Sequence, residues 1–171
     1  MTGARAAGSG IASVVVLSLW LGAAIVVTTV VAPAAFAVLP TRALAGALVG
    51  RVLPVLFWSG AAVGVIVALL VRGHGTPRAP RFAGLAVTIA CLAAQLVVAP
   101  RIARVRVDAG VPIDQLARED PRRVGFGRLH AVSVAMLGVA ALAGSAALFF
   151  TVRTLGTTGV RSGMSNPLHE P

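Results

Sequence analysis

The chain has 171 residues, of which 57% are hydrophobic and 12% charged, and its net charge is +10. A soluble domain carries about a quarter charged residues, so this composition excludes an ordinary soluble protein and indicates an integral membrane protein. The positive charge does not indicate nucleic-acid binding, because the arginines mostly flank apolar runs, where they meet lipid phosphates.

All 15 basic residues are arginine, and alanine and glycine are abundant. This usage is typical of a GC-rich bacterium, so we expect the protein in a bacterial cell membrane, with the lipid bilayer as its first partner. The single cysteine, Cys91, lies inside an apolar run and excludes an internal disulfide.

Four apolar segments are each long enough to cross the bilayer core, which takes about 20 helical residues. They cover residues 11–31, 52–71, 82–99 and 129–152. The predicted fold is therefore all-α: an integral membrane four-helix transmembrane bundle over residues 11–152.

The ends of the chain are polar. We expect residues 1–10 to form a flexible leader and residues 153–171, rich in Gly, Ser and Pro, to form a disordered tail.

Pro33 is expected to break the first helix, which leaves residues 34–40 at the membrane interface. The start of the chain resembles a signal peptide, but its apolar run exceeds the usual 7–15 residues, so we expect it to be retained.

The connections on one side of the membrane are longer than on the other. Residues 41–51 predict a short amphipathic connection, and residues 111–120 predict a short amphipathic helix in the loop between spans 3 and 4. Asp120 and Pro121 suit the N-cap and first position of the fourth helix. Nine arginines on this side against six on the other slightly favour a cytoplasmic long-loop side.

Gly60 and Gly64 lie four residues apart in the second span. Small residues at this spacing let helix backbones approach closely in lipid. We interpret the pair as helix packing inside the bundle, with a dimer face as the alternative.

Six short motifs stand in order along the spans and their loops. They are Trp20-x-Gly22, Leu39-Pro40, Leu53-Pro54-Val55-x-Phe57, Ala99-Pro100-Arg101-Ile102, Glu119-Asp120-Pro121-Arg122 and Phe126-x-Arg128-Leu129-His130-x-x-Ser133. With these motifs the chain resembles the transmembrane-protein-205-like family, whose bacterial members are catalogued as a domain of unknown function. The similarity covers about residues 11–152, and this chain has Leu137 where the family often has Asn.

The resemblance implies a four-helix membrane bundle. It implies little about activity: some members are associated with tolerance of toxic metals or metal-containing drugs, and the bundle is distantly similar to copper-resistance membrane proteins.

Polar residues of the spans gather toward the long-loop side, where polar groups in lipid must pair or face the bundle interior. We predict a shallow ligand-binding pocket there, open to the long loops. Its predicted lining is Thr28, Gln95, His130 and Ser133, with Arg51 or Arg101 at its mouth.

A structural reading of the same residues stays open. His130 would then anchor its helix by bonding a loop carbonyl, and Ser133 and Thr28 would bond their own backbone four residues earlier.

We predict no metal site, no cofactor and no catalysis. A stable metal site needs three or four ligands, and the other histidines, His74 and His169, lie in the opposite loop and the tail. No acidic residue lies within a span, and His130 and Ser133 on one helix do not indicate a catalytic triad.

The leading functional prediction is a small non-enzymatic membrane protein that binds or passes a small solute through the pocket near His130. The alternatives are a structural or accessory subunit without ligand, in a homo-oligomer or with a membrane partner protein, and a metal-handling protein of the copper-resistance type.

Overall fold

The computed structural model describes residues 2–72 and 78–164, with side chains over 7–72 and 78–156. Over these residues the chain is helical and contains no strand. Four helices are long and apolar enough to cross a membrane. The prediction of an all-α transmembrane bundle is confirmed, and the protein is a multi-pass membrane protein.

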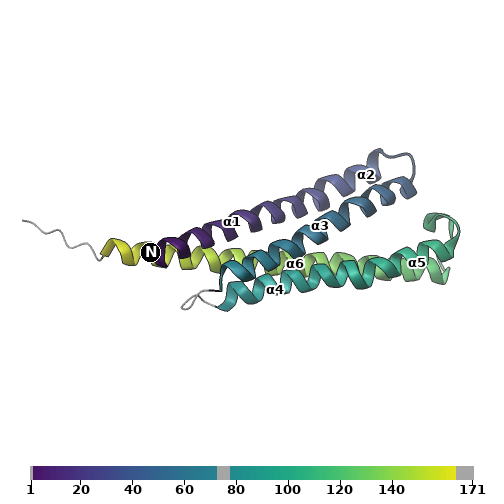
Figure 1. The fold of residues 1–171 in the computed structure, drawn as a ribbon. Coiled ribbons are helices and arrows are strands. Elements are labelled where there is room, and N and C mark those ends of the chain that lie inside the picture. Colours follow the sequence, from purple (N-terminus) through teal and green to yellow (C-terminus); the bar gives the residue numbers. More distant parts are fainter. Residues whose placement is uncertain (1, 73–77, 165–171) are drawn as a thin grey trace, which may run out of the picture.

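The helices run alternately up and down (Figure 1). The N-terminus and the end of the last helix lie at one end of the bundle, and the turn after α2 and the loop after α5 lie at the other. We call the latter the long-loop end. The elements are α1 (Thr2–Val26), η1 (Val27–Val31), α2 (Ala32–Val38), α3 (Arg42–Leu70), α4 (Arg78–Ala93), η2 (Ala94–Val98), α5 (Ala99–Ala109), η3 (Ile113–Gln115) and α6 (Pro121–Met164).

Pro33 does not break the first helix, so that prediction is wrong. The π-turn η1 precedes it, and the Ala32 amide bonds the carbonyl of Val27, five residues earlier. Proline lacks the N–H that an α-helix needs, and the wider turn accommodates this within a continuous rod. Span 3 repeats the device: η2 comes before Pro100, and the sequence Val-Val-Ala-Pro occurs in both places.

The helices extend beyond the predicted spans. Helix α1 starts at Thr2, so most of the predicted flexible leader is helical. Helix α3 starts at Arg42, with Thr41 accepting a hydrogen bond from the Leu44 amide at 3.2 Å, so residues 42–51 belong to the second helix and do not form a separate connection. Helix α6 continues to Met164 through much of the predicted tail, and residues 165–171 lie outside the described part of the chain.

The short helix predicted over residues 111–120 is reduced to the single 3-10 turn η3. Gly110, with φ 67°, ends α5 in the left-handed conformation that glycine adopts without a Cβ penalty. At the start of α6 the N-cap prediction is confirmed, since the Asp120 carboxylate accepts a hydrogen bond from the Arg122 amide at 2.8 Å.

Helix α1 packs against α3 and α6, and α4 packs against the same two helices. Gly60 and Gly64 lie inside this bundle: a Cβ on Gly60 would come within 2.7 Å of Cys91 and Trp20, and one on Gly64 would strike the backbone of Gly84. Both glycines are buried against neighbouring helices of the same chain, which supports the packing interpretation over a dimer face.

Candidate ligand pocket at the long-loop end

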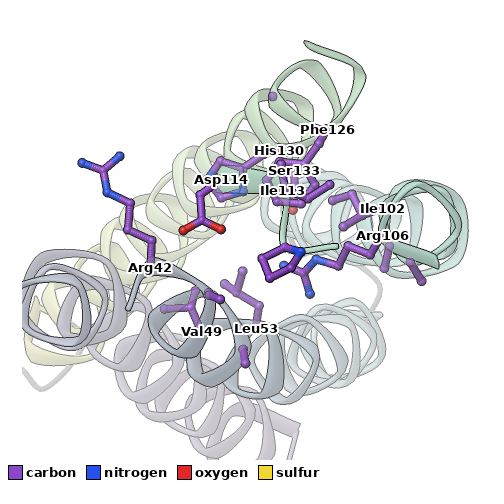
Figure 2. Close-up of a pocket in the computed structure, with 18 of the residues that line it drawn as sticks. Arg42, Val49, Leu53, Ile102, Arg106, Ile113, Asp114, Phe126, His130 and Ser133 are labelled. Atoms are coloured by element: carbon purple, nitrogen blue, oxygen red, sulfur yellow. The ribbon is translucent and has the colours of Figure 1, made fainter. Parts of the chain in front are cut away.

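A pocket of about 810 Å³ opens at the long-loop end, between the first half of α3 on one side and α5, η3 and α6 on the other (Figure 2). Its walls are mainly apolar, with Leu53 and Phe57 from α3 and Ile102 from α5. A few polar and charged side chains converge on it. This combination of size, apolar walls and few polar groups is typical of small-molecule sites.

Three of the predicted site residues line this pocket: Gln95, His130 and Ser133. Gln95 lies in the π-turn η2, and His130 and Ser133 lie one turn apart on α6. Ser133 is only 8% exposed. Among the described residues its hydroxyl makes no hydrogen bond, unlike the serine and threonine hydroxyls that bond the preceding turn.

The other three predicted residues do not line it. Thr28 donates to the carbonyl of Ala24 at 2.7 Å, four residues earlier, as the structural reading expected. Arg51 and Arg101 are exposed and are not among the residues that line the pocket.

The charged lining residues are ones that the sequence reasoning missed: Arg42, Arg106, Arg123 and Asp114. Arg42 is at the rim with its guanidinium turned outward, whereas Arg106 and Asp114 point inward from different elements, α5 and η3 (Figure 2). The signal that could have identified Arg106 is its place three turns beyond Gln95 on the same helix.

Arg106, Phe126 and His130 form one wall of the pocket. The guanidinium carbon of Arg106 lies 5.3 Å from the centre of the Phe126 ring, a cation–π contact. The rings of Phe126 and His130 stack with centroids 6.2 Å apart and an interplanar angle of 4°. His130 therefore rests on an aromatic side chain, and no described loop carbonyl accepts a hydrogen bond from it.

Arg106 also reaches across to α3. Its Nη1 is 3.4 Å from the place that a Cβ on Gly50 would occupy. Pro54, one turn further along α3, has no N–H to donate to the carbonyl of Gly50. At 3.4 Å the contact with such a Cβ would be an ordinary van der Waals contact, so Arg106 packs beside Gly50 without requiring glycine there.

Two arginines at the start of α6 hold the loop 110–120 beside the pocket. Arg123 donates from Nη1 to the carbonyl of Leu116 at 2.6 Å. Arg122 pairs with Asp120 at 2.8 Å and reaches the carbonyl of Asp108 at 3.4 Å. The hydrogen bonds and charge of Arg122 lower the pKa of the Asp120 carboxyl from 3.8 to about 2, so this pair is ionised at neutral pH.

Arg106 and Asp114 differ from these loop residues, because neither side chain makes an ion pair or hydrogen bond in the described part of the chain. The pocket thus presents an unpaired positive side chain, Arg106, and an unpaired negative one, Asp114, near its mouth, with Arg42 at the rim. Within the described residues, no three His, Cys, Asp or Glu side chains gather closely enough to hold a metal ion. His74 and His169 lie outside those residues.

Four membrane-crossing helices with a polar-mouthed pocket at one end define the class: a small polytopic membrane protein with a candidate binding site. The chain belongs to the DUF4149 family, a domain of unknown function, whose family model matches residues 15–110. Neither the curated proteins nor the solved structures contain a significant match to the chain.

The family match bears out the prediction of a membrane domain of unknown function. It covers the first three spans and ends at Gly110, so the motif around His130 and Ser133 lies outside it. The more specific relation to the transmembrane-protein-205-like family stays a prediction.

Proposed function

We propose that this protein is a non-enzymatic membrane protein that binds a small solute in the pocket at the long-loop end. It acts in a bacterial cell membrane, with lipid as its first partner. The resemblance to the transmembrane-protein-205-like family belongs to the same proposal, as does association with further copies or with another membrane protein.

The observation that carries the proposal is the environment of Ser133. The residue is 8% exposed, its hydroxyl makes no hydrogen bond among the described residues, and it lines a pocket of about 810 Å³. No buried side-chain nitrogen or oxygen of the described residues lacks a hydrogen bond, so the unbonded Ser133 hydroxyl is open to the pocket and can bond whatever occupies it. A bound solute or an ordered water would provide the missing partner.

The dimensions of the pocket favour a solute rather than a single water. Its volume falls within the roughly 300–1,000 Å³ of typical ligand pockets. Along α5 and η2 it extends from Gln95 to Arg106, a rise of about 16 Å at 1.5 Å per residue.

Binding without chemistry fits the arrangement of the polar groups. Nucleophilic catalysis would require a hydrogen bond between Ser133 and a base such as His130. The two residues are one turn apart on α6, and among the described residues no hydrogen bond joins them. Asp114, the acidic side chain of the pocket, comes from the turn η3, and among the described residues no hydrogen bond joins it to His130.

The proposal is tested by filling the pocket. Ser133→Leu places a branched apolar side chain where the solute would contact the hydroxyl. Ser145→Leu is the matched control, because Ser145 lies on the same helix but is exposed and outside the pocket. Both variants and the wild type are purified in a neutral detergent, and their small-molecule extracts are compared by mass spectrometry.

We expect a solute at near-stoichiometric amount in the wild type and in Ser145→Leu, and its loss in Ser133→Leu. Equal thermal unfolding midpoints of the two variants would show that the loss is not misfolding. A solute profile identical in all three proteins would overturn the proposal.

A further inference from the structure

We infer that the pocket selects an amphiphile with a zwitterionic head group, one that carries both a phosphate-like anion and an ammonium-like cation on an apolar chain. The inference rests on the proposed function and specifies the ligand class. The inference is based on two side chains of opposite charge that lie at the pocket mouth without forming an ion pair, with apolar walls behind them.

Arg106 and Asp114 supply the two charges. They come from different elements, α5 and the 3-10 turn η3, and both point toward the pocket (Figure 2). The structure gives them no ion pair with each other or with any other described residue. Two opposite charges that face one space without touching are complementary to a ligand that presents both signs.

The other arginines of the pocket do not turn it into a simple anion site. Arg123 is already engaged by the carbonyls of Asp114 and Leu116, and Arg42 is turned outward at the rim (Figure 2). A ligand carrying only a negative charge would gain from Arg106 but would be repelled by Asp114. A ligand carrying only a positive charge would be attracted by Asp114 but repelled by Arg106.

Arg106 is also held in place before any ligand arrives. It stacks over Phe126 at 5.3 Å and passes close to Gly50. A guanidinium fixed in this way loses less rotamer freedom on binding an anion. Its planar fork of donors matches a phosphate or a carboxylate.

The remainder of the pocket accounts for the chain of the amphiphile. Below the charged mouth the lining includes Leu53, Phe57 and Ile102, and the far end carries the neutral groups Gln95 and Ser133. The charges at the mouth and the apolar walls behind them match a lipid head group and the first part of its chain, and a water beyond the chain would bond the Ser133 hydroxyl.

The experiment compares three single-chain probes at equal mole fraction in dodecyl maltoside micelles: dodecylphosphocholine, dodecyl phosphate and dodecyltrimethylammonium. Occupancy is measured by native mass spectrometry. We expect the wild type to bind dodecylphosphocholine about tenfold more tightly than either singly charged probe. A wild type that prefers dodecyl phosphate would indicate an anion site and overturn the inference.

Two variants separate the charges. Arg106→Gln should weaken dodecylphosphocholine about tenfold, the factor that loss of one charge-assisted hydrogen bond of about 1.4 kcal/mol gives. Asp114→Asn should also weaken the binding of dodecylphosphocholine. It should strengthen the binding of dodecyl phosphate, because the repulsion between the Asp114 carboxylate and the phosphate is removed. The matched controls, Arg104→Gln and Asp108→Asn, are exposed neighbours outside the pocket and should change neither probe.

The source of the ligand is distinguished by the extracts of the first experiment. A zwitterionic phospholipid lost only from Ser133→Leu identifies a membrane lipid, whereas a single-chain species lost in the same way identifies a free amphiphile. If a neutral or singly charged solute is lost instead, the zwitterion inference fails while the proposed function stands. If neither a solute nor a probe binds, both fail.

Discussion

Gly64 and Gly84 face each other so closely that a Cβ added to either would strike the backbone carbonyl of the other. From Gly84 the contact to the Gly64 oxygen would be 2.9 Å. Helices α3 and α4 therefore meet backbone to backbone at this point. In lipid such close packing replaces the hydrophobic effect as the force between helices.

Gly64→Ala should therefore destabilise the bundle by about 1–3 kcal/mol, the usual cost of overpacking, since the obstacle is backbone and cannot turn away. Gly138→Ala is the control: nothing lies within 4 Å of its Cβ position, and the better helix propensity of alanine should stabilise by up to about 1 kcal/mol. Thermal unfolding in neutral detergent measures both. If Gly64→Ala left the thermal unfolding midpoint unchanged, the close backbone contact between α3 and α4 would be refuted.

Trp20 joins α1 to α3, because its indole N–H donates to the carbonyl of Leu56 at 3.0 Å. Trp20→Phe removes the bond and part of the ring, and we expect a loss of about 1–2 kcal/mol. Trp58→Phe is matched in chemistry but lies half exposed on the lipid side. Its unfolding midpoint should stay within experimental error of the wild type, and equal losses in the two variants would contradict the assignment.

Much of this bundle was predictable because lipid imposes simple rules. Four apolar runs must be helices, small residues must face neighbours, and the polar residues must gather where they can be paired. Gln95, His130 and Ser133 followed from the last rule. The lengths of the helices did not follow from these rules. In the sequence Arg42 and Arg51 suggested the two ends of a loop, whereas α3 begins at Arg42 and continues through Arg51.

The side of each helix could not be predicted in the same way. An amphipathic helix reveals its buried face by contrast, but a helix apolar all round does not. Arg42 and Arg51 are nine residues apart, which at 3.6 residues per turn places them on opposite sides of α3. Choosing Arg51 for the pocket rather than Arg42 therefore required knowledge of the helix rotation, which only the packing of Gly60 and Gly64 provides.

Thr88 also makes a polar contact between helices, since its hydroxyl lies 3.3 Å from the carbonyl of Ala61 on α3 and 3.2 Å from that of Gly84 on its own helix. Thr88→Val keeps the volume and removes the hydroxyl, so we expect a loss of about 0.6 kcal/mol, the average for such bonds in membranes. Thr29→Val serves as control, because Thr29 bonds only its own helix, to Ile25 at 2.8 Å. A double-mutant cycle with Gly64→Ala should show coupling for Thr88 and none for Thr29.

The Asp120–Arg122 pair should make the long-loop end sensitive to acid. Arg122 lowers the pKa of the Asp120 carboxyl from 3.8 to about 2 in the folded protein. Because the folded pKa lies below the unfolded one, the contribution to stability is complete above pH 3.8 and is lost as the pH falls through about 2. Carbon NMR of the labelled carboxyl should show a midpoint near 2, and Arg122→Gln should move it up toward 3.8. Arg118 is a nearby exposed arginine outside the pair, so Arg118→Gln should leave the midpoint unchanged. If Arg122→Gln also left the midpoint unchanged, a group other than Arg122 would be lowering the pKa of the Asp120 carboxyl.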